Sequence, residues 1–371
     1  MIRFLKAINR FQIKVRTIIR LIPLISSIVD DPSKKSFHPE REIKSRRRIY
    51  LENLLWLIKY GELCENYYMY GFEQKDRKRD WGDYIDYTSF KHLRNKHNRN
   101  KWIGSYCADY TCLLKDKFLF NRMLVSLGFP TPRVFVLYSG GRLHWLEGGD
   151  LSENEAIRKL EGKRVFCKSI LGECADGVFP LRIENGKIYY HGEIITIPQI
   201  LDLTGGSFIM QEEIVQHPEM ARLFPNSVNT MRIVSFHSAE GTELFCGVLR
   251  AGTGENTSDN WAIGGILGII NVETGALDKE FLYKPEYGTI CREHPDTGVV
   301  LGDFQVPFFH EAMDMIRELH PFFYGVKSIG WDIAITEDGP VFIEGNDNWE
   351  MNSYQKDEGA RRKTLERFNR P

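Results

Sequence analysis

The sequence predicts an α+β protein built on antiparallel sheets, and three observations lead to that prediction. From Cys112 onward the chain consists of short β-like runs broken by glycine turns. Few helical stretches separate these runs, so most strands are expected to pair as hairpins rather than through helical crossovers. The glycine loops typical of Rossmann and P-loop nucleotide sites, GxGxxG and GxxxxGK[ST], are absent.

The elements expected after residue 112 follow from apolar periodicity and from the turn residues between them. Strands are expected at Arg133–Tyr138, Arg164–Lys168, Phe179–Ile183, Ser207–Val215, Thr230–His237, Glu243–Ala251 and Ile266–Asn271. Helices are expected at Lys117–Leu127, Glu153–Leu160 and Pro307–Leu319.

The stretch Gly330–Asn346 is the most informative part of the chain. It has two apolar runs joined by a Glu-Asp-Gly-Pro turn, which predicts a β-hairpin. Such a hairpin brings Asp332 beside Glu344, and the alternation of side chains along a strand directs Asn346 the same way as Glu344. Two carboxylates and an amide oxygen suit Mg²⁺ carrying nucleotide phosphates. By itself the spacing also fits an ordinary hairpin with acids facing solvent.

The first 48 residues are strongly basic, with 13 lysines and arginines against 4 acids, although the 371-residue chain has a formal net charge of −1. Residues 1–29 read as a basic amphipathic helix that Pro23 ends or kinks. This helix can lie on an anionic membrane surface, or it can pack on the protein itself or on a partner. Its apolar positions recur at three- and four-residue steps: Phe4, Ile8, Phe11, Val15, Ile18 and Ile22.

Residues 30–111 form a second, mostly helical region that precedes the β-rich part. Within it, 30–42 reads as a linker, 43–72 as helical and 73–101 as an irregular loop or short helix. The β-rich part divides into lobes at 112–215 and 216–355, and 356–371 is a C-terminal tail.

Composition excludes several classes of protein. No apolar run reaches the ~18 residues of a spanning helix, and charges interrupt the N-terminal stretch where a signal peptide would be apolar. Seven cysteines lie scattered without a CxxC pair, which favours reduced thiols in the cytoplasm over a zinc site. The basic residues are confined to the N-terminal segment without a recognition motif, so nucleic acid is not the expected partner.

A nucleotide site can nevertheless be assembled from separate pieces. Lys168 ends a predicted strand, and a loop bounded by Gly172 and Gly177 follows it, which suits phosphate binding by backbone N–H groups and a lysine. A later apolar strand reaches Glu212, Glu213 and Val215, where its backbone could hydrogen-bond adenine. Glu219 follows as an acid for the ribose hydroxyls. Each piece alone also fits an ordinary β-hairpin.

In this order the pieces resemble the ATP-grasp superfamily. Lys117, followed by Gly128-Phe129-Pro130-Thr131-Pro132, looks like the lysine-bearing helix and turn that open that fold. Lys168 and the Gly172–Gly177 loop resemble its second lysine and phosphate lid. Glu212, Glu213, Val215 and Glu219 resemble the adenine hinge and ribose acid, and Asp332, Glu344 and Asn346 resemble the magnesium ligands.

The second half is similar to the α-L-glutamate ligase branch. Arg232 lies in a strand where that branch has an arginine, and Arg250, Asn260 and Gly264-Gly265 reproduce its R-x₉-N-x₃-GG element. The first half of the matched region and the segment from Gln216 to Arg232 most resemble the sugar-transfer-associated ATP-grasp family. The match covers about residues 112–355. Ile263 departs from the arginine of the glutamate ligases, and Asp347 begins a departure from their Ser-Pro-Gly turn, so glutamate is not the expected substrate.

The resemblance implies two α+β lobes that grip ATP, with an N-terminal helical extension. It further implies an ATP- and Mg²⁺-dependent ligase, with Mn²⁺ as a substitute, that activates a small-molecule or glycan carboxylate as an acyl phosphate and joins it to an amine. The catalytic candidates are Arg232, Arg250 and Asn260. The two arginines are candidates because a guanidinium pairs bidentately with phosphate and carboxylate. The basic N-terminal helix would hold the enzyme at the inner face of the membrane. The alternatives are an ATP-dependent phosphotransferase and a non-catalytic nucleotide-binding scaffold.

Overall fold

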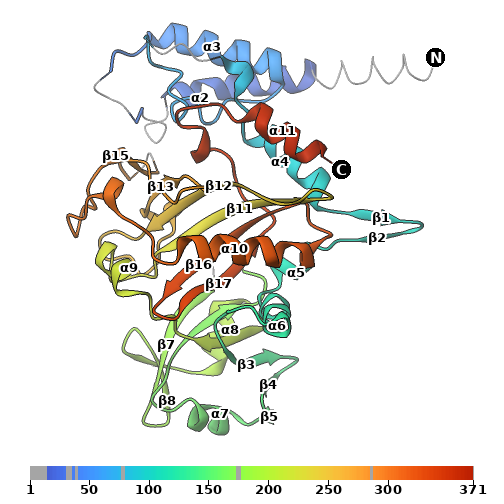
Figure 1. Ribbon diagram of the computed structural model, residues 1–371, viewed down its shortest axis with the longest axis vertical. Coiled ribbons are helices and arrows are strands. Elements are labelled where there is room, and N and C mark those ends of the chain that lie inside the picture. Colours follow the sequence, from blue (N-terminus) through green and yellow to red (C-terminus); the bar gives the residue numbers. More distant parts are fainter. Residues whose placement is uncertain are drawn as a thin grey trace. The chain divides into compact units, whose positions relative to one another are not determined.

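The computed structural model describes residues 15–30, 36–37, 41–76, 80–172, 177–284 and 287–370 (Figure 1). The chain divides into two compact units. One unit, here called the sheet unit, comprises the described residues of 98–278 and 293–347. The other, here called the helical unit, comprises those of 1–97, 279–292 and 348–371.

The first sheet of the sheet unit has eight strands in the order β5-β4-β3-β10-β6-β7-β8-β9, and all neighbours are antiparallel. Its buried face packs against α7 and α8 through side chains such as Val165, Ile200 and Phe208. The strands are β3 (Val134–Ser139), β4 (Arg142–Trp145), β5 (Gly149–Leu151), β6 (Arg164–Ser169), β7 (Val178–Glu184), β8 (Lys187–Tyr190), β9 (Glu193–Ile195) and β10 (Phe208–Glu212), and the helices are α7 (Glu153–Lys159) and α8 (Ile197–Thr204).

The second sheet of the sheet unit contains the strands in the order β13-β12-β11-β16-β17, again antiparallel throughout. Helix α10 (Phe309–Leu319) packs against β12 and β17, and Figure 1 shows it lying across the sheet. Trp331 is fully buried in this sheet. The strands are β11 (Thr230–Ser238), β12 (Gly241–Ala251), β13 (Ile266–Ile270), β16 (Ser328–Thr336) and β17 (Gly339–Asn346).

Shorter elements complete the sheet unit. A two-stranded hairpin, β1 (Lys101–Ile103) and β2 (Tyr106–Ala108), precedes α5 (Cys112–Lys115) and α6 (Lys117–Leu127). The others are α9 (Pro218–Leu223) and the 3₁₀ turns η4 (Trp261–Ile263), η5 (Leu301–Asp303) and η6 (His320–Phe323).

The helical unit is built on α3 (Arg46–Tyr60), whose buried Trp56 contacts Tyr60, Phe72 and Trp81. Gly61 ends α3 in the left-handed conformation that glycine adopts without strain. Its other elements are η1 (Ile22–Leu24), α2 (Ile25–Asp30), η3 (Trp81–Asp83), α4 (Tyr87–Asn98), β14 (Phe281–Tyr283), β15 (Ile290–Cys291), η7 (Ser353–Gln355) and α11 (Arg361–Asn369).

The α+β class with antiparallel sheets and an N-terminal helical region is confirmed. Two expected elements were wrong in extent. Strand β10 ends at Glu212, because the next residues leave the ladder, so the expected strand to Val215 is too long. The helix expected over 43–72 covers only Arg46–Tyr60, since Gly61 stops it. Of the two alternatives for 73–101, a loop or a short helix, the structure has a helix, α4.

The N-terminal segment is described only from residue 15. Residues 15–21 are helical, η1 follows with Pro23, and α2 continues to Asp30, so the helix is interrupted at the proline. Ile25 and Ile28 of α2 are buried. The predicted amphipathic positions Phe4, Ile8 and Phe11 lie outside the described residues. Among the helices that the structure describes, none combines the length and apolar character needed to cross a membrane.

Candidate functional site

The two acids of the β16–β17 hairpin lie directly opposite each other. Asp332 pairs with Glu344 across the ladder, although Ile333 pairs with Phe342, so Ile343 is an extra residue that bulges from β17. A regular two-residue hairpin closing at Thr336 and Gly339 would have placed Ile343 opposite Asp332 and turned Glu344 to the other face. The bulge therefore brings the two carboxylates to one face of the sheet.

Asn346 joins these acids on the same face. Its side-chain Nδ2 donates to Glu344 Oε1 at 3.2 Å and to the Gly330 carbonyl at 3.4 Å. The expected convergence of Asp332, Glu344 and Asn346 at one strand end is thus present in the structure. Asp332 is buried, whereas Glu344 and Asn346 are half-buried.

Two arginines from neighbouring strands meet the same carboxylate. Arg232 of β11 lies opposite Asp332 in the ladder and donates from Nε and Nη2 to its two oxygens, each at 2.6 Å. The Arg232 Nη2 is also 3.7 Å from Glu344 Oε1. Arg250 of β12 places its Nη2 2.9 Å from Asp332 Oδ2. Asp332 is therefore the centre of a buried ion-pair network that spans three strands.

Asp259, which the sequence reasoning did not single out, anchors this network from a loop. It is buried, and its Oδ2 accepts hydrogen bonds from the backbone N (2.9 Å) and the hydroxyl of Thr230. Thr230 Oγ1 in turn accepts from Arg250 Nη2 at 2.7 Å, and Arg250 Nε is 3.7 Å from Asp259 Oδ2. Arg250 is consequently held between two carboxylates. The only sequence signal was the position of Asp259 directly before Asn260.

The charges around the acids shift their pKa values in opposite directions. Burial alone would raise the pKa of Asp332, but the guanidinium groups of Arg232 and Arg250 hold it well below its usual range. Burial and the adjacent Asp332 carboxylate raise the pKa of Glu344. Burial likewise raises the pKa of Asp259. Asp332 is thus held as an anion, and a further cation beside Glu344 would favour its ionised form.

The two candidate lysines approach the acids from the first sheet and its neighbouring helix. Lys168 is buried on β6 and interacts electrostatically with Glu344 and Asp332. Lys117 begins α6, and its backbone N donates to the Ile170 carbonyl at 3.0 Å, which ties the helix start to the end of β6. Burial lowers the pKa of Lys168 to about 8. The two lysines therefore face acids that belong to the other sheet.

The ends of the predicted phosphate loop lie beside these lysines. The Gly172 carbonyl accepts a hydrogen bond from Lys117 Nζ. Gly177 has a φ of 65°, its carbonyl accepts from the Ser169 backbone N at 2.8 Å, and a Cβ there would lie 2.9 Å from the Ser169 Cβ. Residues between them, 173–176, lie outside the described part of the chain. A side chain at Gly177 would be both strained and crowded.

The predicted adenine and ribose residues lie at the end of β10 and on the segment that follows it. Val215 is 76% exposed, and Glu213 forms an ion pair with Arg164 at 2.9 Å. Glu212 is exposed, and its backbone N donates to the Arg133 carbonyl at 2.8 Å. Glu219 lies in the first turn of α9 and pairs with Arg222 at 3.1 Å on the surface.

Asn260 occupies the turn that directly follows Asp259. Its side-chain oxygen accepts from the Ala262 backbone N at 2.9 Å and so caps η4, while Gly264 follows in the left-handed conformation. The Asn260 carbonyl accepts a hydrogen bond from the Gly265 backbone N at 3.2 Å. The contacts that the structure gives Asn260 are those of a residue that shapes the loop beside Asp259.

The turn beyond Asn346 is fixed by buried polar contacts within the sheet unit. Asp347 is buried and pairs with Arg99 at 2.7 Å. Asn98, which is fully buried, donates to the carbonyls of Ser328 (2.8 Å) and Asp347 (3.3 Å). The turn at Asp347, where the sequence departs from the glutamate ligases, is therefore held in place by these buried contacts.

The donor set of this cluster fits a hard divalent cation. In the described part of the chain, no three His, Cys, Asp or Glu side chains are grouped to hold a metal by themselves. An ion at Asp332 and Glu344 would therefore need the Asn346 amide oxygen and oxygens of a ligand, which is the usual way Mg²⁺ is bound beside phosphates. Burial and the adjacent Asp332 carboxylate both raise the pKa of Glu344, and a bound cation would offset both effects.

Comparison with known proteins places most of the chain in one family. The family model described as "Sugar-transfer associated ATP-grasp" matches residues 99–369. That range includes every candidate site residue named above, both sheets and the C-terminal helix. None of the curated proteins matches the chain.

Solved structures show only a distant similarity. A carboxyaminoimidazole ribonucleotide synthase from Aspergillus clavatus, complexed with ATP, has a TM-score of 0.36 and 10% identity over 63% of this chain and 44% of its own. An N5-carboxyaminoimidazole ribonucleotide synthetase from Thermotoga maritima has a TM-score of 0.35 and 12% identity, with coverages of 71% and 49%. This chain thus spans about half the length of these two.

A third structure is matched over a larger share of its length. A D-alanine–D-alanine ligase from Bacillus anthracis has a TM-score of 0.38 and 12% identity, and the match covers 70% of this chain and 67% of the ligase. Similarities at this level say nothing about the substrate of this chain.

Proposed function

This chain belongs to the sugar-transfer-associated ATP-grasp family, and from that membership and the geometry of its ionic cluster we propose that it is an ATP- and Mg²⁺-dependent carboxylate–amine ligase. One observation supports the proposal above the others. A bulged hairpin sets Asp332 opposite Glu344, and four cationic side chains surround the pair: Arg232, Arg250, Lys117 and Lys168.

The charge balance favours a polyanionic ligand. Among the described residues, three carboxylates, those of Asp332, Glu344 and Asp259, lie with those four cations, so the seven named groups carry a net positive charge even with every acid ionised. Burial lowers the pKa of Lys168, so its charged form is unfavourable in free energy until an anion binds beside it. Nucleotide phosphates bring that anion.

In the proposed reaction, the lysines from the first lobe orient the phosphates. A carboxylate oxygen of the substrate attacks the γ-phosphorus, the bond to the β-phosphate oxygen breaks, and ADP leaves. An amine then attacks the acyl carbon of the acyl phosphate, inorganic phosphate leaves, and the amine loses a proton. Arg232 and Arg250 would hold acyl-phosphate oxygens, because a guanidinium binds phosphate and carboxylate bidentately.

Asp332, Glu344 and Asn346 would hold Mg²⁺, or Mn²⁺ in its place. When bound, the ion would neutralise charge on the transferring phosphoryl group. Glu213, Val215 and Glu219 would bind the nucleoside, with backbone groups on adenine and the exposed Glu219 on the ribose. Asn260 would position the loop, and Asp259 would position Arg250.

We further propose the substrate class and location. The family description favours a glycan or glycan-precursor carboxylate, such as a uronic acid, with an amine or amino acid as co-substrate. The enzyme would act in the cytoplasm, and residues 1–29 would hold it at the inner face of the membrane. This placement rests on the basic apolar sequence of that segment, of which residues 1–14 lie outside the described residues.

Hydroxylamine trapping tests the reaction type. The purified protein is incubated with ATP, Mg²⁺, hydroxylamine and single acids from a panel of amino acids and uronic acids. A ligase gives a hydroxamate with one acid, together with equal amounts of ADP and phosphate. Glu344→Gln should give none while remaining folded by circular dichroism.

Other outcomes separate the competing functions. ATP consumption with a stable phosphorylated product and no hydroxamate would identify a phosphotransferase. Binding of ATP without turnover on any acceptor would point to a nucleotide-binding scaffold. Undiminished turnover by Glu344→Gln would overturn the assignment of the acidic pair.

A further inference from the structure

Helix α3 of the helical unit is apolar on both of its sides. Ile49, Trp56 and Leu57 are buried in the unit. Leu51, Leu55 and Ile58 are nevertheless 57%, 56% and 49% exposed. A helix that only covers its own core would carry polar residues at these outward positions.

The three exposed side chains form one continuous stripe. At ~100° per residue, Leu51, Leu55 and Ile58 fall within about 60° of one another around the helix axis, on the side opposite the buried residues. Exposed apolar residues also gather on the preceding segment, where Val15, Ile19 and Leu24 are 37%, 64% and 47% exposed. These six account for much of the exposed large apolar side chains that the structure describes in the helical unit.

Cations accompany the apolar residues. Arg46, Arg47 and Arg48 form the first turn of α3 and are exposed, and Arg16 and Arg20 are exposed beside Val15 and Ile19. Glu52 is the single acid of α3, and it is half-buried in ion pairs with Lys44 and Arg48. The surface of α3 therefore combines exposed leucines with an excess of positive charge.

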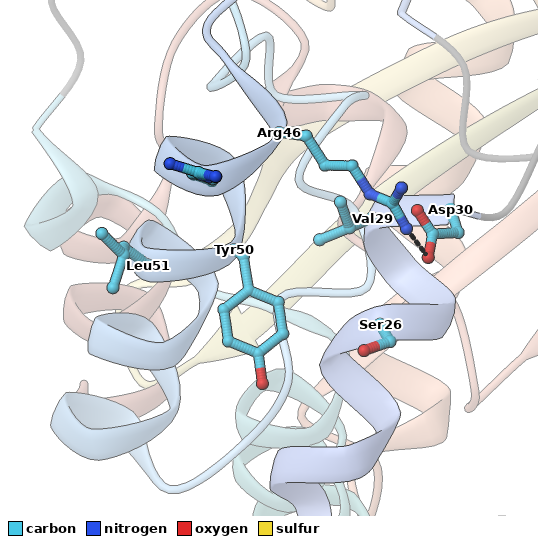
Figure 2. A pocket seen from close by; sticks show the side chains of 7 residues that line it. Ser26, Val29, Asp30, Arg46, Tyr50 and Leu51 are labelled. Atoms are coloured by element: carbon cyan, nitrogen blue, oxygen red, sulfur yellow. Dashed lines mark hydrogen bonds and ion pairs between the residues drawn. The ribbon is translucent and has the colours of Figure 1, made fainter.

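A pocket of about 590 Å³ lies between α2 and α3 at the basic end of the stripe (Figure 2). Figure 2 shows Val29 and Ser26 on the α2 side and Tyr50 and Leu51 on the α3 side. Arg46 forms an ion pair with Asp30 at its edge, so the lining residue Arg47 is the cation that remains for an outside anion.

We propose that the stripe of Leu51, Leu55 and Ile58, with Arg47 and the α2–α3 pocket, is a surface that docks on an anionic lipid bilayer. The leucines would enter the interface between headgroups and acyl chains, while Arg47 would contact lipid phosphates. This surface is distinct from residues 1–14, and the proposal does not depend on the proposed ligase activity.

Charge decides between a bilayer and a second copy of this chain. Two copies meeting through this surface would bury the exposed arginines at the start of both α3 helices, and Glu52, the single acid of α3, already pairs with Lys44 and Arg48. Each arginine near an anionic membrane surface instead strengthens binding about fivefold. The combination of apolar and basic side chains thus matches a lipid surface.

Vesicle flotation tests the proposal on the full chain, without ATP. The probe is vesicles of phosphatidylglycerol and phosphatidylcholine in equal parts, with pure phosphatidylcholine vesicles for comparison. Leu51→Gln/Leu55→Gln should lower the partition coefficient about tenfold or more, because two leucines lose their burial in the interface. Arg47→Gln should lower it about fivefold, only on the anionic vesicles.

Leu203→Gln is the matched control. Leu203 lies on α8 of the sheet unit and is also an exposed leucine, with an exposed fraction of 44%. Its substitution should leave the partition coefficient unchanged. Equal thermal melts of all variants would show that folding is intact. Equal flotation of the double variant and the wild type would overturn the proposal. So would a wild type that ignores vesicles but forms a dimer that the double variant loses.

Discussion

The two sheets of the sheet unit bring charge to the candidate site in different ways. Among the residues that the structure describes, the eight-stranded sheet and the adjoining helix contribute two cations, Lys168 and Lys117. The second sheet contributes both signs, and there Asp332 already satisfies Arg232 and Arg250. The second sheet is therefore organised without a ligand, whereas Lys168 stays in a buried position that lowers its pKa until a phosphate compensates it.

The largest effect should come from Asp332→Asn, because it removes the shared partner of two arginines. Removing one partner of a buried ion pair typically costs about 3–5 kcal/mol of stability. Turnover should fall about 100- to 1,000-fold as well. Urea unfolding and ATP hydrolysis assays measure the two losses, and an unchanged unfolding midpoint would contradict the structural role of Asp332.

Glu344→Gln separates chemistry from folding within the same hairpin. The folded state raises the pKa of Glu344, so a neutral glutamine should leave the free energy of unfolding equal or slightly higher. Turnover should still fall about 100-fold or more. A stability loss as large as that of Asp332→Asn would remove the distinction between the two acids.

Substitution of Lys168 should have the opposite effect to that of Asp332: ATP binding should weaken, whereas the stability of the fold should not fall. Lys168→Met should weaken ATP binding about 10- to 100-fold, because a charged hydrogen bond to phosphate is lost. It should also raise stability at pH 7, since burial disfavours the charged amine. Calorimetric titration with ATP and urea unfolding test both. Lys163→Met, on an exposed lysine, is the matched control.

The pH profile should reveal Lys168 directly. Its folded pKa of about 8 lies below the usual value of 10.5, so it is charged below pH 8 and neutral above it. kcat/KM for ATP should therefore fall as the pH rises through about 8, by up to tenfold per pH unit. The cost to stability of keeping this lysine charged should disappear between about pH 8 and 10.5.

Lys168→Arg supplies the control for that profile. Arginine does not lose its proton in this range, so the fall above pH 8 should vanish. If the variant retains the same alkaline fall, another group titrates.

The smallest effect is expected at Glu219, which lies on the surface next to Arg222. Glu219→Ala should raise the Kd for ATP about threefold to tenfold, as expected for one hydrogen bond to a hydroxyl. Because its proposed partner is the ribose, the same change should weaken binding of 2′-deoxy-ATP less. Equal losses for both nucleotides would place Glu219 away from the 2′-hydroxyl.

Local patterns predicted much of the fold. The helix Lys117–Leu127 has its expected bounds because Asp116 caps its start and Gly128 its end, both readable from neighbouring residues. The strand expected to Val215 ends three residues early, since its last residues have no ladder partner, which sequence alone does not reveal. Strands β8 and β9 and helix α8 were not expected at all.

The sequence by itself determined that Asp332 and Glu344 belong to one hairpin, because the turn between them is local and its residues are distinctive. Only the tertiary structure decided that they share a face, since a single bulge at Ile343 reverses the direction of Glu344. It also decided that Arg232, a hundred residues away, would meet Asp332. Such contacts depend on strand order and register, which follow from the packing of a whole sheet rather than from neighbours in the chain.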